Sequence, residues 1–538
     1  MGIPRFFRYI SETFPECSRQ IKSGECPPVD NLYLDANGII HTCARNVYFP
    51  KQQRLGGKFR APEDREKALF GEICDYIDKL LKFVQPRQTF YIAIDGCAPL
   101  AKQAQQRQRR YKAVATKTQE EFLTFDSTCI TPGTRFMYEL HKHLQWYIQK
   151  QLSFDRAWQR VRVIYSGPQT PGEGEHKIVN WIRADPARGS RVHCMYGLDA
   201  DLFMLSLATG CDKFYLLRED QWSDSSPYFY WVDILQLKRS LHAKWGKGLT
   251  QEALVKEFIF VCFLVGNDFL HASPSFTDLA ESIPFIMDLC QQVLPERTII
   301  TTAGGIDLAN FKILVKKLAE TECAAISAQF YKPQATPNVT LNSALKDTAH
   351  PEQGIDLDKF RMLYYKKAEA DPMKMSLEYI QGLEWVNWYY YHLPNNWQWF
   401  YPFHYTPLLT DIAAFLDSAS ATKLTAVSQK KMPPILPFQQ LLCVVPPASK
   451  ALLPQFLQEL YGKLDFFPTD FKIDLEGKHQ EWEGIALLPF VDITVLKEAC
   501  EEAEKRANST GVRTVFARNG VETAMVYWFS NGIKFAKM

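Results

Sequence analysis

The sequence predicts an α/β protein, with a mostly parallel central sheet flanked by helices and a second helical, aromatic-rich region packed on it. Two observations carry this prediction. Short apolar segments alternate with longer amphipathic segments over the first 220 residues. Such alternation is typical of parallel strands covered by helices on both faces. Aromatic side chains then crowd residues 382–407, GLEWVNWYYYHLPNNWQWFYPFHYTP.

The predicted strands are short, apolar and rich in β-branched or aromatic residues. They are Asn31–Leu34, Thr89–Ile94, Val161–Tyr165, Val192–Tyr196 and Lys213–Leu217. The amphipathic stretches Asp64–Leu81 and Thr134–Leu152 are predicted as helices between them. Near the end of the sequence, the turn signals Asn519-Gly520 and Asn531-Gly532 lie beside strand-like segments, which predicts a hairpin.

The chain is expected to divide into four parts. These are a core over residues 1–327, a linker or surface loop over 328–354, a second region over 355–497 and a hairpin tail over 498–538. Residues 328–354 are interpreted as a linker because they carry Pro, Thr, Asn and Gln with little periodicity.

The composition of the chain limits the classes of protein to which it can belong. Hydrophobic residues make up 46% and charged residues 23% of the chain, as in ordinary globular proteins. The net charge is only +2, so any nucleic-acid signal must be local. The 13 cysteines show no zinc-finger spacing, which favours reduced thiols in an intracellular protein. The apolar run Phe258–Gly266 is too short to span a bilayer, so we expect no membrane association.

Three predicted strands end in aspartate. NLYLD ends at Asp35, TFYIAID ends at Asp95, and VHCMYGLDAD ends at Asp199 and Asp201. Ligands of open α/β sheets bind beyond the carboxyl ends of the strands, so these carboxylates are expected to share one crevice. A single aspartate after a strand is more often a helix cap or turn residue, and it is their number that favours a site.

Further acids follow other apolar segments. Glu173 and Glu175 lie in PGEGEHKI, where a glycine-flanked entry into a helix lets both face one site; the alternative is a solvated helix start. Asp268 follows the apolar run FIFVCFLVGN. Carboxylates placed close together repel one another, so cations are needed to keep them ionised. Oxygen ligands suit Mg²⁺ or Mn²⁺, and two such ions are typical of phosphodiester hydrolysis.

A basic helix is predicted directly after Asp95. Residues 96–119 contain no acid and six Lys or Arg residues. At helical spacing, one face presents the side chains of Lys102, Gln106, Arg109 and Arg110. Arginine suits bidentate phosphate binding, so this face predicts a pocket for one terminal phosphate, too small for a triphosphate or a cap. The alternative is a solvated basic face.

These motifs resemble the Xrn/Rat family of 5′→3′ exoribonucleases, within the flap-endonuclease-like superfamily. The resemblance rests on long segments in order: MGIPRFFRYISETFP, LDANGIIHTC, AIDGCAPLAKQAQQRQRR, FDSTCITPGTRFM, GPQTPGEGEHKI, YGLDADLFML, VGNDFL, GLEWVNWYYYH, WFYPFHYTP, LPFQQLLCVVPP and WEGIALLPFVD. It implies a PIN-like nuclease core over residues 1–327, with the second region completing the active-site pocket.

The resemblance implies a role for each residue class. The metal-binding and catalytic acids fall on Asp35, Asp95, Glu173, Glu175, Asp199, Asp201 and Asp268. The 5′-phosphate pocket falls on Lys102, Gln106, Arg109 and Arg110. A base-stacking histidine falls on His41, and the opposing tryptophan is Trp399 or Trp397, with Trp399 slightly favoured.

The implied activity is processive hydrolysis of single-stranded 5′-monophosphate RNA to nucleoside 5′-monophosphates, in RNA decay. Decapping or decay factors are the partners it suggests, and we expect a monomer in the cytoplasm, with the nucleus as the alternative. The chain resembles a short form without the extra C-terminal domains of large members, so we expect stability or partner binding to be handled differently, with the terminal hairpin as a candidate.

The sequence departs from the family in two places. FLHASPSF follows Asp268 where the family usually has Pro-His-Leu-Pro, and FPKQQRLGGKFRAP is inserted before Asp95. Two alternatives stay open. A DNA flap endonuclease usually has a glycine-rich helix-hairpin-helix after its last metal aspartate, whereas FLHASPSFTDLAESIPF has no glycine. A catalytically inactive RNA-binding scaffold is disfavoured because all seven acids are present.

Overall fold

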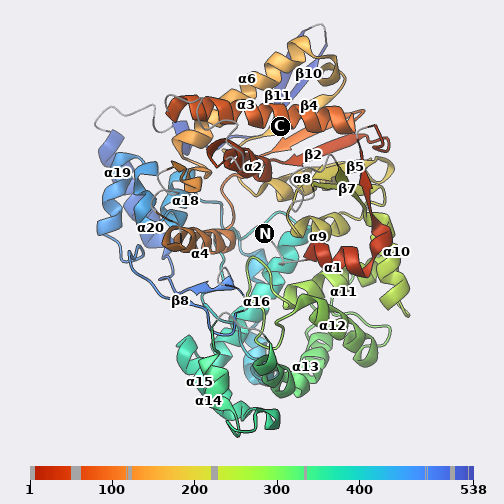
Figure 1. Cartoon of the computed structure of the whole chain (residues 1–538), viewed down its shortest axis with the longest axis vertical. Coiled ribbons are helices and arrows are strands. Elements are labelled where there is room, and N and C mark those ends of the chain that lie inside the picture. The colour runs from red at the N-terminus through yellow and green to blue at the C-terminus, as the bar shows by residue number, and fades with distance from the viewer. Residues whose placement is uncertain are drawn as a thin grey trace.

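We describe the chain from a computed structural model (Figure 1). The structure describes residues 6–22, 24–49, 62–116, 118, 124–219, 228–332, 336–478, 480, 483–508, 515, 517–530 and 532–538. Most of the insertion FPKQQRLGGKFRAP noted above lies outside the described residues.

A central sheet organises the first half of the chain. Its strand order in the described residues is β1-β7-β6-β5-β2-β3-β4-β10-β11. The bounds are β1 Ser18–Ile21, β2 Asn31–Asp35, β3 Thr89–Ala93, β4 Arg162–Ser166, β5 His193–Tyr196, β6 Phe214–Glu219, β7 Phe229–Asp233, β10 Met525–Phe529 and β11 Ile533–Lys537. Strands β6, β5, β2, β3 and β4 are parallel, which confirms the predicted α/β class.

Alternate residues of the parallel strands pack on opposite faces, as the two-residue period of a strand requires. Leu32 and Leu34 of β2 join the core under α2 (Asn37–Tyr48), α3 (Pro62–Val84) and α6 (Arg135–Phe154). Tyr33 joins the core under α8 (Gly174–Ala184), α9 (Asp201–Ala208) and α11 (Gln251–Leu264). The sheet is therefore covered on both faces, with α2, α3 and α6 on the side away from α11 (Figure 1).

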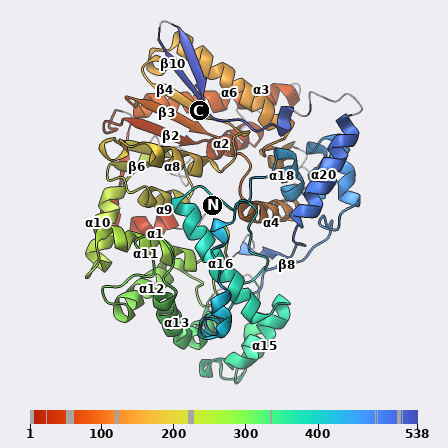
Figure 2. The same ribbon diagram turned by 180° about the vertical axis from the view of Figure 1, so that it is seen from behind.

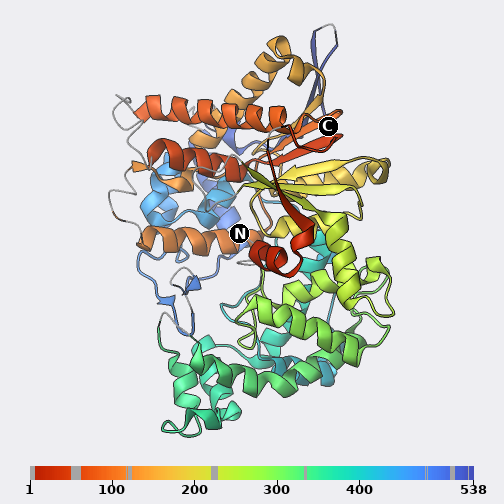
Figure 3. The same ribbon diagram turned by 45° about the vertical axis from the view of Figure 1, so that its right-hand side comes forward.

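The helical remainder lies mainly on the α11 side of the sheet (Figure 3). The other helices are α1 Phe6–Thr13, α4 Leu100–Thr116, α7 Arg156–Gln159, α10 Ile234–Trp245, α12 Leu279–Val293, α13 Leu308–Ala328, α14 Val339–Ala344, α15 Leu357–Ala368, α16 Pro372–Tyr391, α17 Leu409–Asp417, α18 Pro437–Val444, α19 Gln455–Gln458 and α20 Ile493–Asn508. A small hairpin joins β8 (Ile473–Asp474) to β9 (Ile485–Ala486). Seen from behind, α16 runs from the sheet past α9 toward α13 and α15 (Figure 2).

The stretch 328–354 differs from the predicted linker. It contains α14, and Leu341 and Ala344 of that helix are buried together with Ile326 and Ile355. The polar composition of this stretch did not indicate that its few apolar residues are buried. Each of them packs against a segment that is distant in sequence, so no local pattern predicts the contact.

A C-terminal hairpin forms between β10 and β11, and β10 pairs with the outer edge of β4. Asn531 of the predicted turn lies outside the described residues. The other turn signal behaves differently, because Asn519 ends a short 3-10 helix. The hairpin extends the central sheet, so strands from early and late in the chain belong to one sheet, with β1 and β11 at its opposite edges. Among the described residues, no helix combines the length and apolarity needed to cross a bilayer.

The contribution of the hairpin to stability can be tested by substituting one buried and one exposed residue of it. Tyr527 of β10 is 2% exposed and packs in the core on the α3 and α6 side. Tyr527→Ala is expected to lower the free energy of unfolding by about 3 kcal/mol, because it removes a buried aromatic ring. Phe535 of β11 is 63% exposed, so Phe535→Ala should change it by less than about 0.5 kcal/mol. Urea unfolding measures both, and equal effects would contradict this assignment.

Candidate active site

The acids lie where the central strands end. Asp35 is the last residue of β2, Asp95 follows β3, and Asp199 follows β5. Strand β2 lies between β3 and β5 in the sheet, and the chain progresses outward from β2 in both directions. This is the topological switch point of an open parallel sheet, where a crevice forms at the carboxyl ends of the strands.

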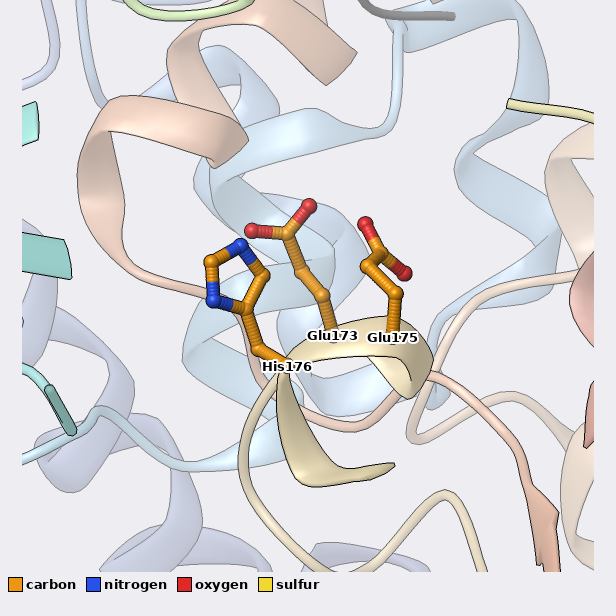
Figure 4. Close-up of side chains that lie close together, drawn as sticks. All are labelled: Glu173, Glu175 and His176. Atoms are coloured by element: carbon orange, nitrogen blue, oxygen red, sulfur yellow. The ribbon is translucent and has the colours of Figure 1, made fainter. Parts of the chain in front are cut away.

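The start of α8 brings in the two glutamates. Glu173 is the N-cap residue with an extended backbone, and Glu175 lies in the first helical turn. Their carboxylates point the same way from the helix start (Figure 4). Gly174 lies between them because a Cβ there would sit 2.7 Å from Asp35 Oδ1. The predicted convergence of Glu173 and Glu175 is thereby confirmed.

Ligand atoms of these acids are close enough to share a cation. One oxygen each from Asp35, Asp95 and Glu175 lie within 4.8 Å of one another. Glu173 and Glu175 form a second group of this kind with His176, whose ring stacks on Tyr389 with centroids 3.8 Å apart. The acids thus form one cluster rather than seven separate helix caps.

Lys102 of α4 lies inside this cluster. Its Nζ is 2.6 Å from Glu173 Oε2 and 2.6 Å from Asp268 Oδ2. Asp268 follows α11, and its other oxygen accepts a hydrogen bond from Gln105 Nε2. Burial alone would lower the pKa of Lys102, but the surrounding carboxylates raise it well above its usual range. Lys102 is therefore a structural counter-ion of the acids.

Asp35 and Glu175 lack sufficient neighbouring positive charge. Burial and the nearby charges of Asp95 and Asp199 raise the pKa of Asp35 well above its ordinary value. Burial, Asp35 and Glu173 do the same to the pKa of Glu175. The buried oxygens Asp35 Oδ1 and Asp201 Oδ1 have no hydrogen-bond partner among the described residues. Unpartnered carboxylate oxygens in a repulsive cluster are compatible with divalent metal binding.

Residues that the sequence analysis did not single out hold the acids in place. Asn37 Nδ2 donates to Asp95 Oδ2 at 2.6 Å, and Gly174 N donates to Asp95 Oδ1 at 2.7 Å. Tyr389 of α16 donates to Glu173 Oε1 at 2.8 Å. Asn37 lies in the LDANG motif and Tyr389 in the WYYYH motif. Both residues therefore lie in segments that carry the family resemblance.

The basic face of α4 adjoins the acids. Gln106 Oε1 and Arg110 Nη1 are buried without a partner among the described residues, while Lys102 is engaged by the acids. Burial and the neighbouring Arg109 lower the pKa of Arg110 to about 9. Two adjacent guanidinium groups that repel each other form an environment that favours an anion.

The aromatic candidates lie on two sides of the site. His41 lies in α2, where burial by the surrounding protein and the charges of Arg109 and Arg110 lower the pKa of its ring to about 4. Trp399 is 8% exposed and stacks on Trp385 in the core. Trp397 is half-buried, with its ring edge 3.8 Å from where a Cβ of Gly172 would lie. Because Trp399 is buried and Trp397 is only half-buried, Trp397 is the better candidate for stacking on a base.

A parallel α/β sheet that gathers carboxylates beside a cationic helix is an architecture suited to a metal-dependent nuclease. Comparison with known proteins identifies the family more specifically than the architecture does. The family profile "XRN 5'-3' exonuclease N-terminus" matches residues 1–220, and "Xrn1 helical domain" matches residues 249–353 and 356–535. The chain belongs to the XRN 5′-3′ exonuclease family.

Several curated relatives align over nearly the whole chain. "5'-3' exoribonuclease 1" of Homo sapiens is 32% identical, covering 99% of this chain and 36% of the relative. The protein of the same name from Schizosaccharomyces pombe is 27% identical, covering 96% and 50%. "5'-3' exoribonuclease 2" of Gallus gallus is 30% identical, covering 96% and 72%. The chain thus spans half or less of the first two relatives.

Solved structures give a weaker likeness. The catalytic core of Rad2 in complex with DNA substrate aligns with a TM-score of 0.33 and 17% sequence identity. That alignment covers 60% of this chain and 76% of the Rad2 chain. A score this low supports no conclusion about function.

The role of the Tyr389–Glu173 hydrogen bond in metal binding by the acid cluster can be tested by substitution. Tyr389→Phe removes the donor but keeps the ring stacked on His176. Affinity for Mn²⁺ is expected to fall by about tenfold, the usual cost of losing a partner that orients a ligand. Calorimetric titration with Mn²⁺ measures it.

Tyr391 on the same helix provides the matched control. Its hydroxyl has no hydrogen-bond partner among the described residues. Tyr391→Phe should therefore leave Mn²⁺ affinity unchanged. If Tyr389→Phe binds Mn²⁺ as tightly as Tyr391→Phe does, the orienting role of Tyr389 is wrong.

Proposed function

We propose that this chain is a 5′→3′ exoribonuclease that hydrolyses single-stranded 5′-monophosphate RNA to nucleoside 5′-monophosphates, using two Mg²⁺ or Mn²⁺ ions. The observation that carries the proposal is that α4 joins two features. Lys102 binds the acid cluster, while Arg109 and Arg110 lie on the same helix beside His41. The family membership and the names of the relatives supply the direction and the RNA substrate.

The seven acids are proposed to hold the ions and to orient the scissile phosphate. They are Asp35, Asp95, Glu173, Glu175, Asp199, Asp201 and Asp268. Bound divalent ions supply a nucleophilic water at neutral pH and stabilise charge on the leaving oxygen. The protein's own contribution is positional: Asn37 and Gly174 fix Asp95, and Tyr389 and Lys102 fix Glu173.

End selection is proposed to come from α4. Arg109 and Arg110, with the Gln106 amide, bind the terminal 5′-phosphate, because fixed guanidinium groups match phosphate oxygens in a bidentate manner. Lys102 is the fourth predicted member of this pocket, and its contact with Asp268 links the pocket to the acids. A pocket that accepts one terminal phosphate is proposed to exclude the bulkier triphosphate.

Base stacking is proposed to guide the strand. His41 is neutral at physiological pH, since its pKa is lowered to about 4, and a neutral aromatic ring stacks on bases without regard to sequence. Trp397 is proposed as the opposing ring. It is accessible at the site edge, and its backbone oxygen accepts from Leu100 N at the start of α4.

The activity predicts discrimination between RNA ends. With Mg²⁺, the protein is expected to degrade 5′-monophosphate RNA to mononucleotides and to spare 5′-triphosphate RNA of the same sequence. Asp201→Ala is expected to lower the rate by at least about 100-fold, because it removes a buried acid of the cluster. Product analysis on sequencing gels measures both.

Three results would contradict this proposal. They are equal cleavage of both RNA ends, unchanged activity of Asp201→Ala, and preferential cleavage of branched DNA offered in parallel. The last would favour a flap endonuclease. A fourth result, binding of RNA without any cleavage by the wild-type protein, would also contradict it and would favour an inactive scaffold.

The two tryptophans predict different defects. Trp397→Ala is expected to weaken binding of single-stranded RNA by about 1–3 kcal/mol through loss of base stacking. Trp399→Ala is expected to lower the free energy of unfolding by about 3–5 kcal/mol, because its ring is part of the core. Fluorescence anisotropy with Asp201→Ala as the background measures binding, and urea unfolding measures stability. Reversed effects would reinstate Trp399 as the stacking residue.

A further inference from the structure

The loop from Gly197 to Ala200 presents two of the proposed metal-binding acids. It joins β5 to α9, with Asp199 inside the loop and Asp201 as the first residue of the helix. The N-cap residue of α9 is Ala200, which makes no side-chain cap hydrogen bond. The start of this helix therefore lacks a restraint that most helices have, and the direction of the two acids depends on contacts from other elements.

Arg218 of strand β6 makes such a contact. Its guanidinium donates to three consecutive carbonyl oxygens of the loop, which are those of Gly197 at 3.4 Å, Leu198, and Asp199 at 2.9 Å. Each carbonyl oxygen lies in the plane of its peptide group. Holding three of them in a row therefore fixes the backbone on both sides of Asp199, from which its side chain leaves, and Asp201 follows two residues later.

The register of the sheet places Arg218 at this loop. Strands β5 and β6 run parallel, with Tyr196 at the end of β5 beside Leu217. The next residue of β6 is therefore level with the first residue of the loop. The guanidinium reaches the loop carbonyls from the side, as the strand of the neighbouring pair continues past the end of β5.

Two aromatic rings hold the guanidinium in turn. Its Cζ lies 4.7 Å from the ring centroid of Phe7 in α1 and 5.5 Å from that of Phe203 in α9. A cation beside an aromatic face is attracted to it, more strongly away from water, and Arg218 is 6% exposed. Burial lowers the pKa of Arg218 to about 10 and attraction to Asp199 opposes that shift, so the group is charged at neutral pH.

A charged, buried group with a fixed position can hold a loop more precisely than the loop's own residues can. Partners that orient metal ligands in this way contribute strongly to metal affinity. Resting on the function proposed above, we infer that Arg218 is a positioning residue, which holds the loop backbone so that Asp199 and Asp201 both face the place where the metal ions bind.

Replacing Arg218 tests this role. Arg218→Met keeps a long side chain beside Phe7 and Phe203 but removes every hydrogen bond to the loop. Its affinity for Mn²⁺, measured by calorimetric titration, is expected to fall by about tenfold. Arg218→Lys keeps the charge, but a single ammonium cannot reproduce the planar fork of donors, so a smaller loss of affinity is expected.

Lys238 of α10 provides the matched control. It is 5% exposed, and its Nζ donates to the backbone oxygen of Cys211 at 2.9 Å. Cys211 lies between α9 and β6, before the strand begins, whereas Arg218 lies near the end of the same strand. Lys238→Met therefore also removes a buried cation from a backbone carbonyl, but it should leave Mn²⁺ affinity unchanged. Urea unfolding shows that each variant is folded under the conditions of titration.

A kinetic measurement separates positioning from a general loss of stability. The rate of cleavage of 5′-monophosphate RNA is followed as Mn²⁺ is raised. Folded Arg218→Lys is expected to need severalfold more Mn²⁺ for its half-maximal rate, while KM for the RNA at saturating Mn²⁺ stays that of wild type, because the phosphate-binding face of α4 is untouched. Lys238→Met should match wild type in both quantities.

The outcomes distinguish this role from the proposed function. If Arg218→Met and Arg218→Lys bind Mn²⁺ as tightly as Lys238→Met does, Arg218 is not a positioning residue; if Arg218→Met does not fold, Arg218→Lys alone decides. A wild-type protein that binds Mn²⁺ but leaves the RNA intact would contradict the proposed function only, since the Mn²⁺ affinities still decide the role of Arg218. A wild-type protein that binds no Mn²⁺ would overturn both.

Discussion

The contact on which the site depends is the ammonium of Lys102 between Glu173 and Asp268. Buried carboxylates repel one another, and a cluster of them cannot persist without compensating charge. Lys102 supplies part of that charge and ties three elements together: α4, the start of α8 and the loop after α11. Loss of this cation would leave buried carboxylates unpaired, which is far more costly than loss of a surface pair.

The helical second half is part of the site as well as a support for it. Tyr389 of α16 orients Glu173, and the backbone of Trp397 receives the first N–H of α4. Arg107 of α4 donates to the backbone of Cys443 in α18. The position of α4 therefore depends on segments several hundred residues away, so both family-profile regions contribute residues to the candidate site.

Helix α4 carries two kinds of group. Lys102 reaches the acids, and Arg109 and Arg110 lie beside His41. A single rigid helix can hold such groups at fixed separations, which loops do less well. The proposed phosphate pocket and the acid cluster are therefore held together by one element.

The sequence by itself determined the sheet and the acids. Short, continuously apolar segments specify buried parallel strands, and aspartates at their carboxyl ends must converge because those ends share one edge. Only the tertiary structure decided that Lys102 pairs with acids, that Trp399 is core and Trp397 accessible, and that Leu341 anchors α14. The reason is physical: Lys102 and Asp268 lie 166 positions apart, and burial at such contacts depends on packing between elements, which no local pattern encodes.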